Sequence, residues 1–322
     1  MINQRRWLAG LFAGLLGFCG CVRLHPAWHN STPTSVVQPE PKPSLAAYAS
    51  PRSREREIKV RRRYRLKQIE IEIEANHASS GGPIVIDYYQ CSSQPSPVIL
   101  LLPISGGNYE VESFFAGYIA KHGIAVALLH RPTNSEPKLS DLGAINTWLE
   151  ENVWRDKRAL DWIESRPELE TNKVGVFGIS MGAIQGVLLT AADRRIGASV
   201  FGLVGGDLPY ILCQSAEPGI MKHRNAFLRE HNLSEQQLHE QLRKAITCEP
   251  NTAAADIDPQ DVLLVLAAFD RVVPFKKGLE LRLRLRRPET IIVPTGHYSA
   301  VVYVPYLRRQ TLKFFRDRFF DE

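Results

Sequence analysis

The sequence lacks the motifs by which metal and nucleotide sites are usually recognised. It contains no His-Glu-x-x-His, no cysteine pair near a histidine pair, and no glycine-rich phosphate-binding loop. No segment combines basic and aromatic residues in the way of a nucleic-acid-binding module. We therefore expect a protein that uses no metal and no cofactor, and that has no nucleic-acid partner.

Apolar runs long enough to cross a membrane are also missing near the start. The uncharged stretch 7–18 follows Arg5 and Arg6 and is shorter than the ~20 residues that a span needs. With the Cys19-Gly20-Cys21 that follows, it resembles a bacterial lipoprotein signal, which implies cleavage before Cys21 and lipidation of this residue. The segment departs from the usual pattern in having Phe18 where an aliphatic residue is common. A plain secretory signal or an uncleaved anchor is the alternative. We expect 1–21 to direct the chain to the bacterial cell envelope, anchored at the membrane, periplasmic or secreted.

Cysteine is scarce, with five in 322 residues. Three of them, Cys91, Cys213 and Cys248, lie beyond the N-terminal pair. Outside the cytoplasm a disulfide is permitted, and Cys213 with Cys248 is the expected pair because both fall in one segment. Three free, apolar thiols are the equally good alternative.

The segment 22–53 has few residues that could form a core. It is rich in proline, serine, threonine and alanine, and such a composition cannot bury enough apolar surface to fold. It predicts a flexible tether between the N-terminal segment and a single folded domain at 54–322.

The net charge of +6 is modest, and much of the basic excess lies near the N-terminal side. Basic residues crowd the stretch 54–67, and Ile69, Ile71 and Ile73 then alternate with glutamates. This period-2 pattern predicts strands with one solvated face, continued by a strand at 84–89. The favoured interpretation of the basic run is a solvated strand face, and contact with anionic lipid or a polyanion is the alternative.

The rest of the chain alternates strands with helices, which predicts a mostly parallel sheet flanked by helices on both faces. The expected core strands are continuous apolar runs, typical of buried parallel strands, at 97–103, 124–129, 173–179, 197–204, 261–269 and 290–294. Helices are expected at 114–121, 139–165, after Ser180, at 279–287 and at 305–320. The stretch 207–257 interrupts this rhythm with leucines at helical spacing and predicts a small helical cap insertion.

Ser180, Asp270 and His297 each follow one of these core strands. Because the carboxyl ends of parallel strands share one edge of a sheet, we expect the three side chains to meet there. Gly178-Ile179-Ser180-Met181-Gly182 predicts a sharp turn between strand and helix that exposes the serine hydroxyl. A serine becomes a useful nucleophile only when it is exposed beside a base and oxyanion donors.

Three motifs together resemble the α/β-hydrolase superfamily over the chain from about residue 57 onward. They are Gly178-Ile179-Ser180-Met181-Gly182, Asp270-Arg271-Val272-Val273-Pro274 and Gly296-His297-Tyr298. The resemblance implies an α/β-hydrolase fold in which Ser180 attacks an acyl carbon, His297 transfers the proton and Asp270 orients the histidine. It further implies oxyanion donors at the backbone N–H groups of Met181 and Ser105. The chain departs from the usual His-Gly oxyanion loop, having Pro103 and Ile104 there.

Asp207 and His130 are the rival acid and base, since each also ends a core strand. Asp207 fits a turn into the cap equally well, and Asp270 is preferred. Because His130 precedes the serine in the chain, it is expected to line the pocket or to be solvated. The expected function is an exported serine hydrolase, most simply a carboxylic-ester hydrolase acting on a small-molecule or lipid acyl ester. An acyltransferase or peptidase with the same three residues is an alternative, as is a catalytically silent binding or assembly protein of the envelope.

Overall fold

The computed structural model describes residues 20–26, 51–73, 82–92, 95–106, 108–132, 135–137, 139 and 141–320. The expected signal segment therefore lies outside the described residues except for Gly20 and Cys21, and so does most of the expected tether. Among the helices that the structure describes, none combines the length and hydropathy needed to cross a bilayer.

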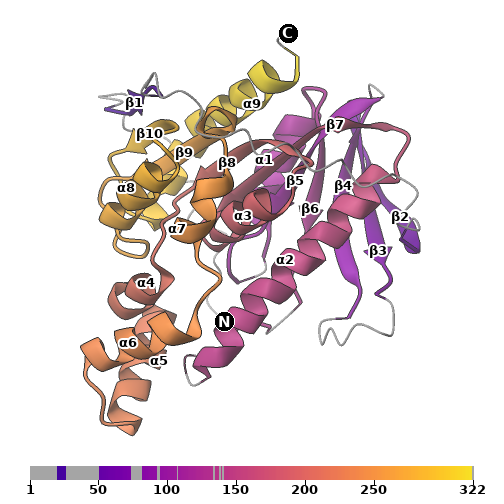
Figure 1. Ribbon diagram of the computed structural model, residues 1–322. Coiled ribbons are helices and arrows are strands. Elements are labelled where there is room, and N and C mark those ends of the chain that lie inside the picture. The colour runs from indigo at the N-terminus through magenta and orange to yellow at the C-terminus, as the bar shows by residue number, and fades with distance from the viewer. Residues whose placement is uncertain are drawn as a thin grey trace, which may run out of the picture.

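A single ten-stranded sheet forms the centre of the protein (Figure 1). Its spatial order is β1-β10-β9-β8-β7-β5-β6-β4-β3-β2. In chain order the strands are β1 (Val22–Leu24), β2 (Ser53–Val60), β3 (Tyr64–Ile71), β4 (Ile84–Cys91), β5 (Ser96–Leu102), β6 (Ala125–Leu129), β7 (Leu169–Ile179), β8 (Ile196–Gly202), β9 (Val262–Ala267) and β10 (Glu289–Val293). The six strands from β6 to β10 across the middle are parallel, whereas β1, β2, β3 and β4 pair antiparallel with their neighbours.

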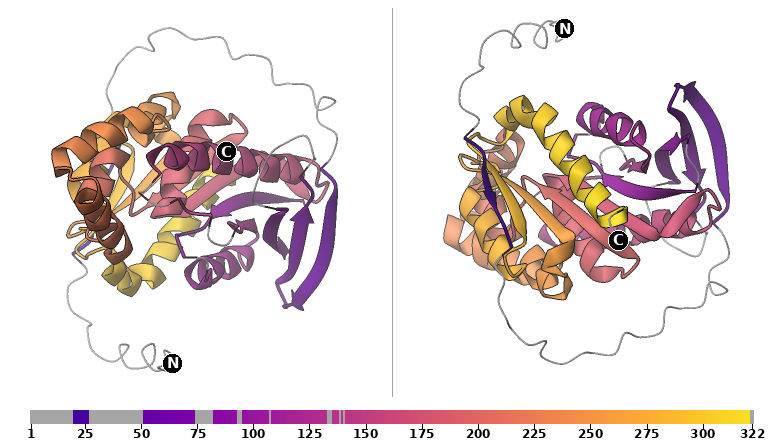
Figure 2. Two further views of the ribbon diagram at one scale, coloured as in Figure 1. Left: turned by 90° about the horizontal axis from the view of Figure 1, so that it is seen from below. Right: turned by 90° about the horizontal axis from the view of Figure 1, so that it is seen from above.

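Helices cover both faces of this sheet, as Figure 2 shows. One face carries α2 (Leu142–Glu164), α3 (Met181–Ala192) and α8 (Phe275–Arg284), and the other carries α1 (Glu110–Ala120) and α9 (Val304–Phe319). The prediction of a mostly parallel sheet between two helical layers is confirmed.

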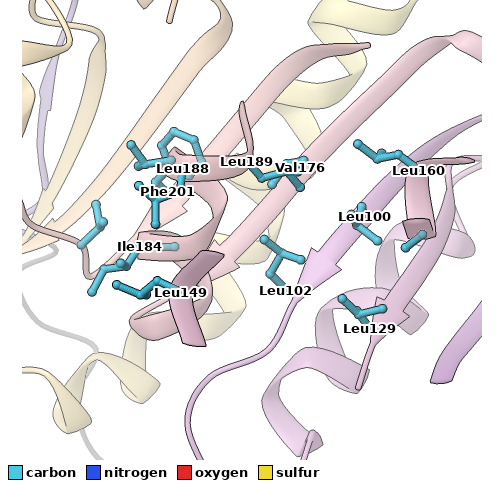
Figure 3. Packing of buried hydrophobic residues seen from close by; sticks show 14 of the residues in the cluster. Leu100, Leu102, Leu129, Leu149, Leu160, Val176, Ile184, Leu188, Leu189 and Phe201 are labelled. Carbon is cyan, nitrogen blue, oxygen red and sulfur yellow. The ribbon is translucent and has the colours of Figure 1, made fainter. Parts of the chain in front are cut away.

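The continuous apolar runs in the sequence follow from burial on both faces. In β5, Leu100 and Leu102 belong to the core cluster under α2 and α3, whereas Ile99 and Leu101 belong to the cluster under α1 and α9. All four side chains are fully buried. Figure 3 shows the first of these layers, in which side chains of β5 and β7 pack against those of α2 and α3. Loss of alternation is thus the mark of a central strand.

The edge strand β1 departs from the expectation that 22–53 carries no fixed structure. Val22–Leu24 pairs antiparallel with β10, and the Arg23 guanidinium donates a hydrogen bond to Glu289 at 2.7 Å. The strand has three residues, too few to show a periodicity that the sequence could reveal. Cys21 is therefore followed directly by the sheet, not by a long flexible segment.

The cap, residues 207–257, lies between β8 and β9 as a group of helices. They are α4 (Leu208–Gln214), α5 (Pro218–Glu230), α6 (Glu235–Ala245), α7 (Pro250–Ala253) and the 3₁₀ turn η3 (Ala254–Asp256). A second 3₁₀ turn, η4 (Pro259–Asp261), leads into β9. Leu238 and Leu242 of α6 are fully buried, which explains the leucines at helical spacing in this stretch.

The expected disulfide between Cys213 and Cys248 is wrong in this structure, where both are free thiols. Cys213 lies on α4, whereas the backbone N–H of Cys248 donates to Asn146 on α2. The two cysteines therefore have different neighbours, and α6 packs against both α4 and α2. Burial raises the pKa of each thiol to about 11, so both stay protonated at neutral pH.

Candidate active site

Ser180 stands at a strained turn between β7 and α3. Its φ of 55° and ψ of −119° lie outside the regions that L-residues normally adopt. The two flanking glycines permit this turn. A Cβ on Gly178 would lie 2.2 Å from the Gly182 carbonyl oxygen, and one on Gly182 would lie 2.3 Å from the Leu102 carbonyl oxygen. The spacing of the two glycines in the sequence therefore has a steric cause.

A chain of hydrogen bonds links the three predicted residues. Ser180 Oγ lies 3.0 Å from His297 Nε2, and His297 Nδ1 lies 2.7 Å from Asp270 Oδ2. The two pairs are 117 and 27 residues apart in the sequence, so the order of strands in the sheet, and not proximity in the chain, brings them together. With Nδ1–H donating to the carboxylate, Nε2 is free to accept the serine proton.

The carboxylate of Asp270 is held by the turn that follows β9. Its Oδ1 accepts the backbone N–H groups of Val272 and Val273 at 2.8 and 2.9 Å, which leaves Oδ2 for His297. The residue is only 7% exposed. Two backbone donors and a buried setting fix the orientation of the acid, as a residue that orients an imidazole requires.

The two expected oxyanion donors line the same cavity as Ser180. Met181 is the first residue of α3, where a backbone N–H has no carbonyl partner within the helix. Ser105 lies in the loop between β5 and α1, and both residues line the same cavity as Ser180. An N–H at a helix N-terminus and a second one from a facing loop can together stabilise a developing negative oxygen.

Glu112 is a residue of this region that the sequence interpretation missed. Its Oε1 accepts the backbone N–H of Ile104 at 2.7 Å, so that the loop holding Ser105 is attached to α1. The side chain is 1% exposed, and burial raises the pKa of its carboxyl above the ordinary value. Its signal in the sequence is weak, because Glu110 and Glu112 both lie in the first turn of α1, where acidic residues are common, and nothing in the sequence distinguishes the buried one.

The structure gives the two rival residues other partners, although His130 lines the same cavity as Ser180. Asp207 begins α4 as its N-cap, accepting the N–H of Tyr210, and its carboxylate also pairs with Lys277. His130 lies 3.2 Å from the Asp87 carboxylate and stacks on the Tyr109 ring. No hydrogen bond joins either of them to Ser180 or His297 within the described part of the chain.

A cavity of about 1360 Å³ opens at Ser180 and His297. Arg131 and His130 contribute polar groups to its wall, and the Arg131 guanidinium is paired with the buried Asp156. Apolar side chains of α2, α3 and the cap form one part of the remaining wall: Ile145, Trp148, Leu149, Ile184, Leu208, Ile211, Leu212 and Ile220. No cluster of three or more potential metal ligands occurs among the residues that the structure describes.

Comparisons with known proteins identify the fold. No protein-family model and no curated protein matches the chain. An acetyl xylan esterase from Paenibacillus sp. R4 superposes with a TM-score of 0.64 at 16% identity, over 85% of this chain and 91% of that one. Acetyl xylan esterase 1 from Thermoanaerobacterium sp. JW/SL YS485 gives 0.61 at 15% identity, over 83% and 89%. The α/β hydrolase GrgF from Penicillium sp. sh18 gives 0.52 at 13% identity, over 83% and 99%. At these identities the similarity establishes the α/β-hydrolase fold of the chain and leaves the activity to be argued from the site.

Proposed function

We propose that the protein is a serine hydrolase that cleaves carboxylic esters through an acyl-enzyme on Ser180. The observation that carries this proposal is the hydrogen-bonded chain from Ser180 through His297 to Asp270, which opens on a cavity. The esterases among the structural neighbours are consistent with it.

In the acylation step, the Oγ of Ser180 attacks the carbonyl carbon of the ester while His297 Nε2 takes the hydroxyl proton. The carbonyl oxygen becomes an oxyanion, for which the N–H groups of Met181 and Ser105 are the proposed donors. Collapse of the tetrahedral intermediate breaks the bond to the alcohol oxygen, which leaves with the proton from His297. Asp270 stabilises the imidazolium and holds its tautomer without itself taking the proton.

Deacylation repeats these roles with water in place of the serine. His297 takes a proton from a water molecule, whose oxygen attacks the acyl carbon. When the second tetrahedral intermediate collapses, Ser180 leaves with the proton and a carboxylic acid is released. Hydrolysis therefore needs only a base, an oxyanion site and access for water.

The cavity favours an ester with a sizeable apolar group. Its volume of about 1360 Å³ exceeds the ~300–1,000 Å³ typical of small-ligand pockets. The part of its wall that comes from α2, α3 and the cap offers aliphatic side chains and the ring of Trp148. Each methylene group of a substrate buried there gains about 0.8 kcal/mol. We therefore propose a medium-length or longer acyl or alkyl group as the preferred one.

Export to the bacterial cell envelope remains part of the proposal on the strength of the sequence pattern at 1–21. A lipid on Cys21 would lie directly beside β1, because Val22 already pairs with Ile292 of β10. The domain would then be held close to the membrane. Intact mass of the protein purified from membranes tests this point, since lipidation adds the mass of the acyl groups and removes residues 1–20.

Labelling with a fluorophosphonate probe tests the reaction type. We expect the folded protein to be labelled, Ser180→Ala to lose the label, and the control Ser53→Ala, on the exposed strand β2, to keep it. Folded protein that takes up no label would favour a silent binding or assembly protein. Labelled protein that transfers the acyl group to an added alcohol in preference to water would favour an acyltransferase.

A further inference from the structure

The positive charge of the protein is concentrated in one β-hairpin. Nine cationic and only two anionic residues lie between 52 and 67. This segment alone carries a net +7, whereas the whole chain carries +6. The remaining residues are thus close to neutral in sum. The hairpin, formed by β2 and β3, is therefore the main source of the net positive charge.

Among the described residues, acidic side chains pair with two cations at the base of this hairpin and with none at its tip. Arg54 pairs with Glu72, and Lys67 pairs with Glu55. Five further cations gather at and beside the turn, are exposed, and pair with no acidic residue in the part of the chain that the structure describes: Lys59, Arg61, Arg62, Arg63 and Arg65. The tip is therefore a compact patch of unpaired positive charge, here called the cationic tip.

Two aliphatic side chains accompany the cationic tip at the surface. Ile58 and Val60 are 46% and 59% exposed, although a strand could have directed them to the core. A register shift between Glu57 and Lys59 places Ile58 at a β-bulge. The ring nearest the turn, Tyr64, is half-buried and packs at a tilt against the ring of Tyr89. The tip thus presents aliphatic groups among cations and no exposed aromatic ring.

The cationic tip lies away from the candidate active site. Strand β3 is antiparallel to β4, which is antiparallel to β6, so β3 runs in the direction of the parallel strands. The turn before β3 therefore belongs to the edge of the sheet from which those strands start. Ser180, Asp270 and His297 follow the opposite ends of their strands. In both views of Figure 2 the hairpin stands at the periphery of the molecule, where a flat surface could meet it.

We propose that the cationic tip docks the protein on an anionic lipid surface. Charge complementarity provides the attraction, and each cation near such a surface strengthens binding several-fold. Ile58 and Val60 favour a lipid over a nucleic acid, because aliphatic groups enter the boundary between headgroups and acyl chains while single-stranded nucleic acids are usually held by aromatic stacking. Charged residues along an edge strand can protect it against aggregation. That role does not explain the arginines here, because three of them lie in the turn and not along the β2 edge. Docking in this way leaves the mouth of the cavity open. Because β1 and β2 are opposite edges of the sheet, it is a different attachment from one through Cys21 beside β1.

Co-sedimentation with vesicles tests the proposal. The full chain is mixed with vesicles of pure phosphatidylcholine or with 30 mol% phosphatidylglycerol, and the quantity measured is the ratio of the two partition coefficients. A lipid group or apolar segment elsewhere in the chain binds both vesicles and cancels in this ratio. We expect preference for the anionic vesicle that weakens with salt.

Three variants sharpen this test. Arg61→Gln/Arg62→Gln/Arg63→Gln should lower the ratio on the order of 100-fold. The control Arg229→Gln/Arg243→Gln/Lys244→Gln, with three exposed cations removed from the cap, should change it little. Ile58→Ser/Val60→Ser should weaken vesicle binding roughly tenfold without affecting binding to single-stranded DNA. Thermal melts confirm that each variant is folded.

Two results would overturn the proposal. One is an unchanged ratio in the folded arginine variant. The other is tighter binding to DNA than to anionic vesicles together with indifference to the change at Ile58 and Val60, which would assign the tip to a nucleic acid or another polyanion. Neither result depends on the proposed ester hydrolysis, because no step of the assay requires turnover.

Discussion

Removal of the Glu112 carboxylate tests how the loop with the proposed oxyanion donor Ser105 is held. In Glu112→Ala the Ile104 N–H loses the acceptor that lies 2.7 Å away, and the loop that contains Ser105 is released from α1. A hydrogen bond to a charged group is worth about 1.5–3 kcal/mol. If the transition state loses stabilisation of this size because the proposed oxyanion donor shifts, kcat falls by roughly 10- to 100-fold. This loss is smaller than the ~10²–10³-fold loss that follows deletion of a donor itself.

Steady-state kinetics on a p-nitrophenyl ester separate this role from a general structural one. Because the loop acts on the transition state, kcat should fall while KM stays within about twofold. Glu112→Gln retains an acceptor oxygen and should recover most of the activity. Glu110→Gln, an exposed acid in the same turn of α1, serves as the matched control. Equal losses in kcat for Glu112→Ala and Glu110→Gln, or a rise in KM alone, would refute the reasoning.

The raised pKa of Glu112 adds a dependence of stability on pH. Because burial raises the pKa of this acid above 4.5, the folded state keeps its proton at pH values where the unfolded chain has lost it. The contribution of Glu112 to the free energy of unfolding therefore falls as pH rises from about 4.5 through the raised value. Urea unfolding should show that Glu112→Gln gains stability relative to wild type over this range. A difference that stays constant with pH would contradict the assignment.

Three further substitutions follow from the geometry of the site. Gly182→Ala should destabilise the protein by at least about 1–3 kcal/mol in urea unfolding, because its Cβ would meet the Leu102 carbonyl. The control Gly197→Ala has room for a Cβ and should be neutral. Equal effects of the two substitutions would contradict the steric account. Asp270→Asn should lower kcat by about 10⁴-fold at unchanged melting temperature, and a loss below tenfold would remove Asp270 from the proposed mechanism. Leu212→Trp should narrow the cavity at its apolar wall and lower kcat/KM for an octanoyl ester by roughly tenfold or more, while kcat/KM for an acetyl ester stays unchanged. A parallel loss for both esters would show that the acyl group binds elsewhere.

Much of the fold could be predicted because burial on two faces erases the alternation of a strand. The run from Val98 to Leu102 is apolar at every position since α2 and α3 cover one side and α1 and α9 the other. The glycines beside Ser180 were equally informative, because a Cβ at either position would lie only 2.2 or 2.3 Å from a backbone carbonyl oxygen. The chain order of strands then brought Ser180, Asp270 and His297 to one edge.

The features that escaped prediction depend on contacts between distant parts of the chain. β1 has three residues and owes its structure to β10, more than 260 positions away. Glu112 matters through a single hydrogen bond to a loop whose shape the sequence does not reveal. The cysteine pairing was wrong because proximity in the chain does not fix which way a helix turns its side chains. The cationic run was favoured as a solvated face, and only the pairing of strands showed which of its charges lack partners.

The most direct test of the central claim is mass spectrometry of the acid-quenched reaction with p-nitrophenyl octanoate. The account predicts a transient increase in mass equal to one octanoyl group, located on the peptide that contains Ser180 and absent from Ser180→Ala. It also predicts that the adduct disappears as octanoic acid is released. Two results would contradict the proposed acyl-enzyme. One is turnover without an adduct on Ser180, and the other is turnover of Ser180→Ala at the wild-type rate.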